Sequence, residues 1–376
     1  MNIAIIGGGI GGLALANCFQ KFKIPYTLYE RSSHFGEVGA GIGISESTIT
    51  ILNSLGLESS LKQKGKIVQN ILLVNKKAKL IRKLPLNNAG FCIHRYDLIS
   101  VLSESLNKNN LKLGYEVDSF NQELESVKLH FKNGQSQVHD YVFACDGIDS
   151  IFRKKLIPSI EKRYSGQTVW RGIANCKLPE CYKTAYTEFW GENLRFATIP
   201  LKRDDSYYWY ACKNAEANDI YDDQLVKEEL KALFKGFNIE IQKVINSTTQ
   251  ILRNDMWDLK PHYQDWHQKN IIFLGDSIHA TTPNLAQGGC QAIEDAYTIA
   301  KLIALKGTND NTFKLYRNLR IKKVNYIVNQ SWKYGKISHQ GNKISEIIIQ
   351  YIFKFLPKSY FINQYRKISN IDYLGF

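Results

Sequence analysis

The strongest constraint on the fold is a glycine-rich turn near the start of the chain. An apolar run at residues 2–6 is followed by GGGIGG, which fits the pattern G-x-G-x-x-G. A patterned helix at 10–22 and a second apolar strand at 26–30 come next. Such a turn lets the backbone approach a pyrophosphate at the N-terminus of a helix. We therefore predict a Rossmann-like unit that binds a dinucleotide through Gly7, Gly9, Ile10, Gly11 and Gly12.

Glu30 ends the second strand of this unit, and Arg31 follows it. A carboxylate at this place accepts hydrogen bonds from ribose hydroxyls. It therefore favours FAD or NAD over a cofactor with a phosphorylated adenosine ribose.

Two later strands also end at a carboxylate beside a glycine. Asp146-Gly147 follows the apolar run 141–145, and Gly275-Asp276 follows the run 271–274. After Gly275-Asp276 come Pro283, the pair Gly288-Gly289 and a helical pattern at 290–303. Carboxyl ends of parallel strands meet at one edge of a sheet, where ligands bind. We expect Asp276 to hold a polyol or ribose hydroxyl, and the helix start to face an anion or an electron-rich ring.

The middle of the chain has a different character. The segments 168–176, 185–190, 194–200 and 207–212 are rich in Trp, Tyr and Phe and are separated by polar turns, which is typical of an antiparallel sheet. The fold class we predict is α/β, in which a mostly antiparallel sheet is inserted into a Rossmann-like domain and a helical tail follows. We expect a discontinuous nucleotide-binding domain at residues 1–70, 92–163 and 262–306, a substrate-binding domain at residues 71–91 and 164–261, and a helical tail at residues 307–376.

The motifs occur in a characteristic order: G-x-G-x-x-G, then D-G-x-x-S-x-x-R at 146–153, then G-D with P-x-x-x-Q-G-G behind it. This set resembles the single-component (class A) FAD-dependent monooxygenases of the para-hydroxybenzoate hydroxylase type. The resemblance extends from residue 1 to about residue 305, and it includes the glycine loop at 39–43 and Arg95-x-x-Leu98. Ala286 departs from the family pattern, since glycine is frequent at this position.

The resemblance implies roles for the motif residues. Glu30 would hold the adenosine ribose and Asp276 the ribityl chain, while Gly288 and Gly289 would lie against the flavin ring. The other residues it places at the cofactor are Arg31, Gly41, Arg95, Asp146, Gly147, Gly275 and Pro283. The implied reaction uses FAD, NADH or NADPH, and O2, and it hydroxylates an aromatic or similarly electron-rich small molecule through a flavin C4a-hydroperoxide.

Four residues of the aromatic segments are our candidates for contact with a substrate: Arg171, Arg195, Tyr208 and Tyr210. An arginine suits a substrate carboxylate or phenolate, and a tyrosine can orient a hydroxyl. The alternative is that they are ordinary sheet residues, with the arginines paired to carboxylates and the tyrosines in the core.

Composition narrows the remaining choices. The seven cysteines include no C-x-x-C pair, which argues against a zinc site or a dithiol redox centre. We expect these cysteines to be reduced and the protein to be cytoplasmic. The chain begins directly with a strand, so we expect no signal peptide. Since only one dinucleotide fingerprint is present, we expect no separate NAD(P)H domain. No motif indicates nucleic-acid binding.

The C-terminal part is strongly basic, with thirteen Lys or Arg against three Asp or Glu from residue 306 onward. This charge fits a solvated helix face, or a surface that touches anionic lipid peripherally or binds an acidic partner. Two other functions therefore stay open. One is epoxidation or hydroxylation of a lipophilic isoprenoid, quinone or polyene at a membrane. The other is a flavoprotein that senses redox state or binds a partner without a monooxygenase product.

Overall fold

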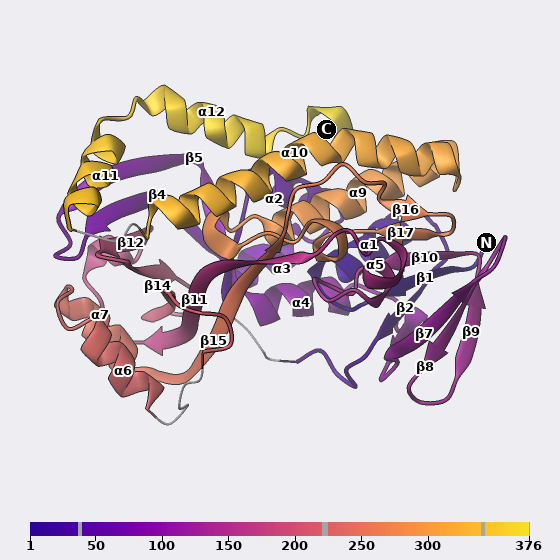
Figure 1. Ribbon diagram of the computed structural model, residues 1–376, viewed down its shortest axis with the longest axis horizontal. Coiled ribbons are helices and arrows are strands. Elements are labelled where there is room, and N and C mark those ends of the chain that lie inside the picture. The colour runs from indigo at the N-terminus through magenta and orange to yellow at the C-terminus, as the bar shows by residue number, and fades with distance from the viewer. Residues whose placement is uncertain (37–39, 220–224, 340–342, 376) are drawn as a thin grey trace.

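The computed structural model describes residues 1–36, 40–219, 225–339 and 343–375, so Gly39 of the glycine loop lies outside the described residues. Two large sheets dominate, and the long helix α10 (Asp310–Ile337) runs across both of them (Figure 1). A smaller antiparallel sheet is formed by β7 (Val117–Gln122), β8 (Val127–Phe131) and β9 (Ser136–His139). No helix among the described residues is long and apolar enough to cross a membrane.

The first large sheet is the predicted Rossmann-like sheet. Its order is β16-β17-β10-β1-β2-β6, and all neighbours are parallel except β16 and β17. The strands are β1 (Ile3–Ile6), β2 (Thr27–Glu30), β6 (Leu111–Leu113), β10 (Tyr141–Ala144), β16 (His267–Gln268) and β17 (Ile271–Phe273). Because β1, β10 and β17 are adjacent and parallel, the three motifs that follow them lie at the same edge.

Helices cover this sheet and bury its apolar strands. They are α1 (Ile10–Lys21), α2 (Glu46–Ser54), α3 (Glu58–Lys64), α4 (Arg95–Glu104), α5 (Ile151–Leu156), α8 (Asp276–His279) and α9 (Gly288–Lys306). The shared core includes Ile5, Leu15, Phe143, Ile272 and Ile299, all fully buried. The α1 and α9 helices pack on each other, which places the two glycine-rich helix starts side by side.

The second large sheet has the order β15-β11-β14-β13-β12-β4-β5-β3 and is antiparallel apart from the β12–β4 pair. Its strands are β3 (Gly41–Ile44), β4 (Lys66–Asn75), β5 (Leu80–His94), β11 (Lys162–Asn175), β12 (Ala185–Gly191), β13 (Leu194–Pro200), β14 (Ser206–Asn214) and β15 (Thr248–Leu259). The sequence patterns did not predict β15, α3 or α7. The helices α6 (Val226–Leu233) and α7 (Ile239–Asn246) pack on one face around Trp209 and Phe196.

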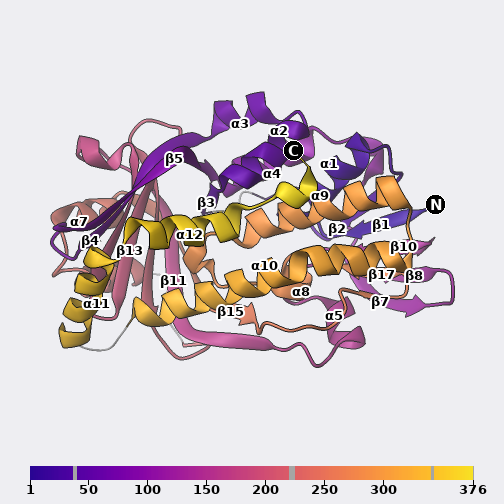
Figure 2. The same ribbon diagram turned by 90° about the horizontal axis from the view of Figure 1, so that it is seen from above.

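The tail ends in two more helices, α11 (Lys343–Phe355) and α12 (Lys358–Ser369), on the outside of the molecule (Figure 2). The predicted fold class, including the helical C-terminal region, agrees with this architecture.

Candidate active site

In the first glycine-rich turn, two glycines are needed for close packing of the backbone, and a third borders open space. Gly7 has φ +105°, and a Cβ there would lie 2.4 Å from the carbonyl oxygen of Cys145. A Cβ at Gly12 would lie 1.9 Å from the carbonyl oxygen of Gly7. A Cβ at Gly9 would meet no described atom within 4 Å. Gly7 and Gly12 thus permit close backbone packing, whereas Gly9 borders space that a ligand can enter.

Glu30 is held in place at the end of β2. Its Oε2 accepts a hydrogen bond from the N–H of Gly8 (2.5 Å), and its Oε1 accepts one from the N–H of Ser32 (2.9 Å). The carboxylate therefore lies beside the glycine turn, where the ribose of a bound dinucleotide would be. Arg31 is exposed next to it.

Asp146-Gly147 lies at the end of the neighbouring strand β10. The Oδ2 of Asp146 accepts a hydrogen bond from the N–H of Ile151 (3.0 Å), while its buried Oδ1 has no hydrogen-bond partner in the described structure. Burial raises the pKa of this carboxyl to about 6. Gly147 has φ +82° and open space around it. Arg153 donates to the carbonyl oxygens of Ser277 (2.8 Å) and Ile148 (2.6 Å), which ties this motif to the next one.

Gly275-Asp276 is the third motif at this edge of the Rossmann-like sheet. Gly275 has φ +64°, and its N–H donates to Oδ2 of Asp295 (3.1 Å), which also contacts Nε2 of His279 (2.5 Å). Desolvation by the surrounding protein raises the pKa of the Asp276 carboxyl, although solvent reaches part of this side chain; the neighbouring His279 and Arg95 act in the opposite direction. Exposure to solvent together with a raised pKa is expected for a carboxyl group that lies in a concave site.

The loop after Asp276 brings the remaining glycines to the same place. A Cβ at Gly288 would lie 3.8 Å from Oδ1 of Asp276, and one at Gly289 would lie 2.9 Å from Ile42 and 3.3 Å from Ile10. The intervening turn contains Pro283 and Ala286.

Ala286 adopts the left-handed conformation (φ +52°). Its Cβ lies 3.6 Å from the position that a Cβ would take at Gly43. The residue that departs from the family pattern thus occupies a conformation that favours glycine.

These contacts test whether FAD fits. The space beside Gly9, the unpartnered oxygen of Asp146 and the accessible carboxylates of Glu30 and Asp276 line one edge of the sheet. Together they match what an extended dinucleotide needs: room for a pyrophosphate and acceptors for two sets of hydroxyls. The residues present therefore fit FAD.

The four candidate substrate residues lie on one face of the second large sheet. Tyr210 pairs with Arg171 of β11, and Arg195 of β13 pairs with Cys212, two residues beyond Tyr210. Tyr208 lies two residues before Tyr210. Because side chains alternate along a strand, all four residues share the face opposite to the core of α6 and α7. This face looks toward the motifs, since a Cβ at Gly41 would lie 2.6 Å from the ring of Tyr208.

The two arginines of this face differ in their partners. Arg195 is fully buried, contacts Oε1 of Glu188 (3.3 Å) and donates to Oδ1 of Asn284 (2.5 Å). Its charge is therefore balanced by the protein. Arg171 donates to the amide oxygen of Asn254, and its buried Nε has no hydrogen-bond partner among the described residues. No carboxylate of the described structure forms an ion pair with Arg171.

Arg171 also lies in the electrostatic range of Arg95. Burial, and then the charge of Arg171, lower the pKa of Arg95, while Asp276 raises it. Arg95 is half-buried at the start of α4. The candidate substrate face and the cofactor edge therefore meet around these two arginines and Asp276.

Several residues of this face were missed in the sequence. Oε2 of Glu188 accepts hydrogen bonds from the hydroxyls of Tyr186 and Tyr334 (3.3 Å for Tyr334), and the hydroxyl of Tyr186 lies 2.5 Å from that of Tyr210. Alternation in the segment 185–191 was a signal for Glu188, because it puts a carboxylate on the same face as Tyr186. Nothing local in the sequence linked Tyr334 of α10 to this sheet.

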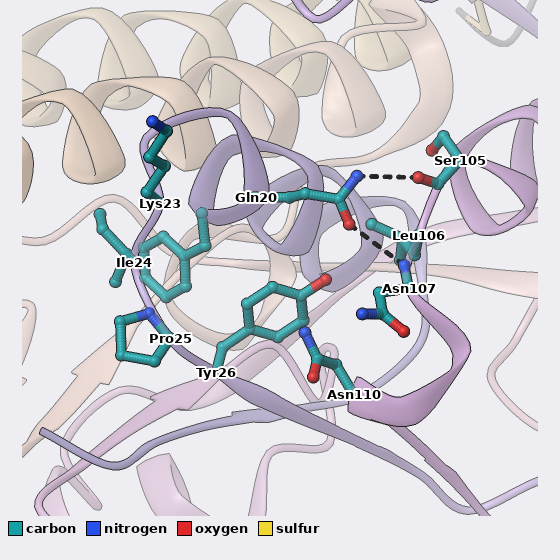
Figure 3. A pocket seen from close by; sticks show the side chains of 10 residues that line it. Gln20, Lys23, Ile24, Pro25, Tyr26, Ser105, Leu106, Asn107 and Asn110 are labelled. Atoms are coloured by element: carbon teal, nitrogen blue, oxygen red, sulfur yellow. Dashed lines mark hydrogen bonds between the residues drawn. The ribbon is translucent and has the colours of Figure 1, made fainter.

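A hollow of about 560 Å³ lies elsewhere, between the ends of α1 and α4 (Figure 3). Gln20 joins the two helices there: it donates to the carbonyl oxygen of Ser105 (2.9 Å) and accepts from the N–H of Asn107 (3.1 Å). This hollow contains none of the motif residues, so we do not assign the cofactor or substrate to it.

Comparison with known proteins gives consistent matches along the chain. The model of a family described as "FAD binding domain" matches residues 1–330. The chain is 31% identical to an aurachin C monooxygenase/isomerase of Stigmatella aurantiaca, over 91% of each chain. It is 27% identical to a 2-heptyl-3-hydroxy-4(1H)-quinolone synthase of Pseudomonas aeruginosa, over 96% of this chain and 95% of that one. The structure of Klebsiella pneumoniae HpxO complexed with FAD and uric acid is similar in fold, with a TM-score of 0.89, 21% identity, and 98% and 96% coverage.

Proposed function

From the premise that this chain belongs to the FAD-binding domain family, we propose that it hydroxylates a 4(1H)-quinolone or a closely related nitrogen heterocycle that carries an apolar chain. The family and the FAD cofactor predicted from the sequence are confirmed by the FAD-binding family model, and the predicted enzyme class is confirmed because relatives are named as monooxygenases or hydroxylases. These names favour ring hydroxylation over the epoxidase and redox-sensor alternatives. The substrate is our proposal.

The name of one relative supports this substrate class. The product named for the P. aeruginosa relative is a 4(1H)-quinolone with a 3-hydroxyl and a 2-heptyl group. When bound, FAD supplies reduction by NAD(P)H and activation of O2. The balance is one ring C–H, O2, NAD(P)H and a proton giving C–OH, water and NAD(P)⁺.

The observation that carries the proposal is Arg171. Its guanidinium has no carboxylate partner in the described structure, and its Nε is buried and unpaired. A quinolone has a carbonyl oxygen that accepts hydrogen bonds, so a guanidinium that donates to it can fix the position of the ring. We propose that Arg171 donates to this carbonyl oxygen, and that Tyr208 and Tyr210 orient the ring. Arg195 positions the Pro283 loop through Asn284.

The test compares 2-heptyl-4(1H)-quinolone with 3-hydroxybenzoate and urate, measuring NAD(P)H consumption and peroxide release together. We expect the quinolone to raise NAD(P)H consumption at least about tenfold without matching peroxide. In Arg171→Gln the quinolone should lose most of this stimulation, whereas Arg203→Gln, in the β13–β14 turn, should retain it. A larger stimulation by 3-hydroxybenzoate or urate would overturn the proposed substrate.

The sequence also suggested a location and a division into domains, which we keep as proposals. Seven free cysteines favour a reducing compartment, and we propose the cytoplasm. We propose the domain boundaries at about 70, 92, 164, 262 and 307. Contact of the tail with a membrane is argued from its residues below.

A further inference from the structure

The helix α11 has apolar side chains on two opposite sides. On its inner side, Phe353 packs against Trp190 with ring centres 4.9 Å apart, and Ile349 joins the same cluster with Leu73 and Ile81. The inner side therefore accounts for why the helix is held on the sheet. It does not explain why the outer side of α11 is apolar as well.

The outer side of α11 exposes a continuous apolar stripe. Ile344 and Phe355 are 72% and 70% exposed, and every large apolar residue of the stripe is at least 47% exposed. The stripe consists of Ile344, Ile347, Ile348, Tyr351, Ile352 and Phe355. Their spacing of three and four residues places them on one side of the helix. The next helix, α12, adds exposed Tyr360, Ile362 and Tyr365. A contiguous apolar patch of this kind marks a binding surface.

The charges around the stripe are mainly positive. Residues 344–370 contain four basic residues and one acidic residue. The basic residues are Lys354, Lys358, Arg366 and Lys367, all exposed. The acidic residue is Glu346, whose carboxylate accepts a hydrogen bond from Gln350 (2.7 Å).

We propose that the outer side of α11, together with α12, docks in the plane of an anionic lipid surface. Isoleucine and phenylalanine side chains enter the acyl boundary of such a surface, tyrosines lie at the headgroup level, and lysines contact the lipid phosphates. At 13 and 12 residues, the two helices are too short to span a bilayer and suit an in-plane position.

Charge favours lipid over a second copy of the chain. A two-fold interface through α11 and α12 would bring the basic residues of both copies together, three of which lie on α12, and Glu346 is the acidic residue of this surface. An anionic lipid surface supplies the opposite charge without this repulsion. Both figures show α11 and α12 at the outside of the molecule, where a flat surface can reach them (Figures 1 and 2).

The docking surface is also connected to the candidate substrate face. Phe353 on its inner side contacts Trp190, whose indole N–H donates to Oε1 of Glu188 (3.0 Å), and Glu188 contacts Arg195. The docking inference itself does not depend on the proposed substrate.

The test uses the FAD-loaded full-length protein and sedimentation with vesicles of phosphatidylcholine, with or without phosphatidylglycerol. We expect binding to the anionic vesicles that weakens as salt is added. In Ile348→Glu/Phe355→Glu the partition coefficient should fall at least about tenfold. The control, Leu124→Glu/Tyr263→Glu, introduces the same charge at two large residues outside α11 and α12 that are 88% and 72% exposed, and it should bind within about twofold of the parent.

Three results would overturn the inference. The first is no binding to anionic vesicles at low salt. The second is equal binding of the α11 variant and its control. The third is a dimer of the parent that the α11 variant converts to a monomer, since the surface would then be an interface between copies. Retained FAD absorbance in both variants shows that any loss of binding is not a loss of folding.

Discussion

The substitution Gly9→Ala tests whether the open space beside Gly9 serves a ligand or is required for folding. Gly9 has φ −75° and ψ −176°, which alanine adopts without strain, and its Cβ would meet no described atom within 4 Å. We therefore expect the free energy of unfolding of the FAD-free protein to stay the same or rise by about 0.4–1 kcal/mol. Urea denaturation followed by tryptophan fluorescence measures this quantity.

The same methyl group should weaken FAD binding. If it displaces the pyrophosphate from one charge-assisted hydrogen bond, the cost is about 1.5–3 kcal/mol, which raises the dissociation constant at least about tenfold. A titration of FAD into the FAD-free protein measures this change. Gly12→Ala should instead impair folding, because its Cβ would lie 1.9 Å from the carbonyl oxygen of Gly7. Gly236→Ala, also in open space but far from the motifs, should change the free energy of unfolding within the same range and leave the FAD affinity unchanged. Unchanged FAD affinity in Gly9→Ala would refute the assignment of this turn.

Two further predictions concern stability. Arg320→Met removes a buried cation that pairs with Glu294 and with Asp295 (2.7 Å), so we expect a loss of about 3–5 kcal/mol of unfolding free energy. Lys314→Met, at an exposed ion pair, should leave the unfolding free energy nearly unchanged. Similar urea midpoints for both variants would contradict this prediction. Burial lowers the pKa of His139 to about 4, so the stability held by the neutral ring is complete above about pH 6.5 and is lost as the pH falls toward 4. In His139→Gln the urea midpoint should therefore fall less between pH 7 and pH 4.5 than in the parent, and an equal fall would argue against this role.

The sequence predicted most of what is local in this fold. The turns at Gly7, Asp146 and Gly275 each follow a short apolar strand, and at the second and third of them a glycine and a carboxylate are adjacent in the chain. The parallel sheet then brings them to one edge. The strand β15 was missed because TTQILRNDMWDL lacks regular alternation between polar and apolar residues, while its pairing with β11 supplies the stability that the pattern does not indicate.

The partners of the candidate substrate residues were less predictable. Arg171 and Arg195 look alike in the sequence, yet the first donates to the amide oxygen of Asn254 and the second forms an ion pair with Glu188. This difference depends on strand register and on the approach of α10, which are tertiary properties. The charge of Arg195 is already balanced by Glu188 in the folded protein, which its sequence context did not indicate.

One measurement tests the central claim most directly. The FAD-loaded enzyme is given NAD(P)H, 2-heptyl-4(1H)-quinolone and O2 labelled with oxygen-18, and the product is analysed by mass spectrometry. We predict a hydroxylated quinolone that carries one labelled oxygen, formed in step with NAD(P)H consumption and greatly reduced in Arg171→Gln. An unchanged quinolone, with all NAD(P)H consumption recovered as labelled peroxide, would contradict this account.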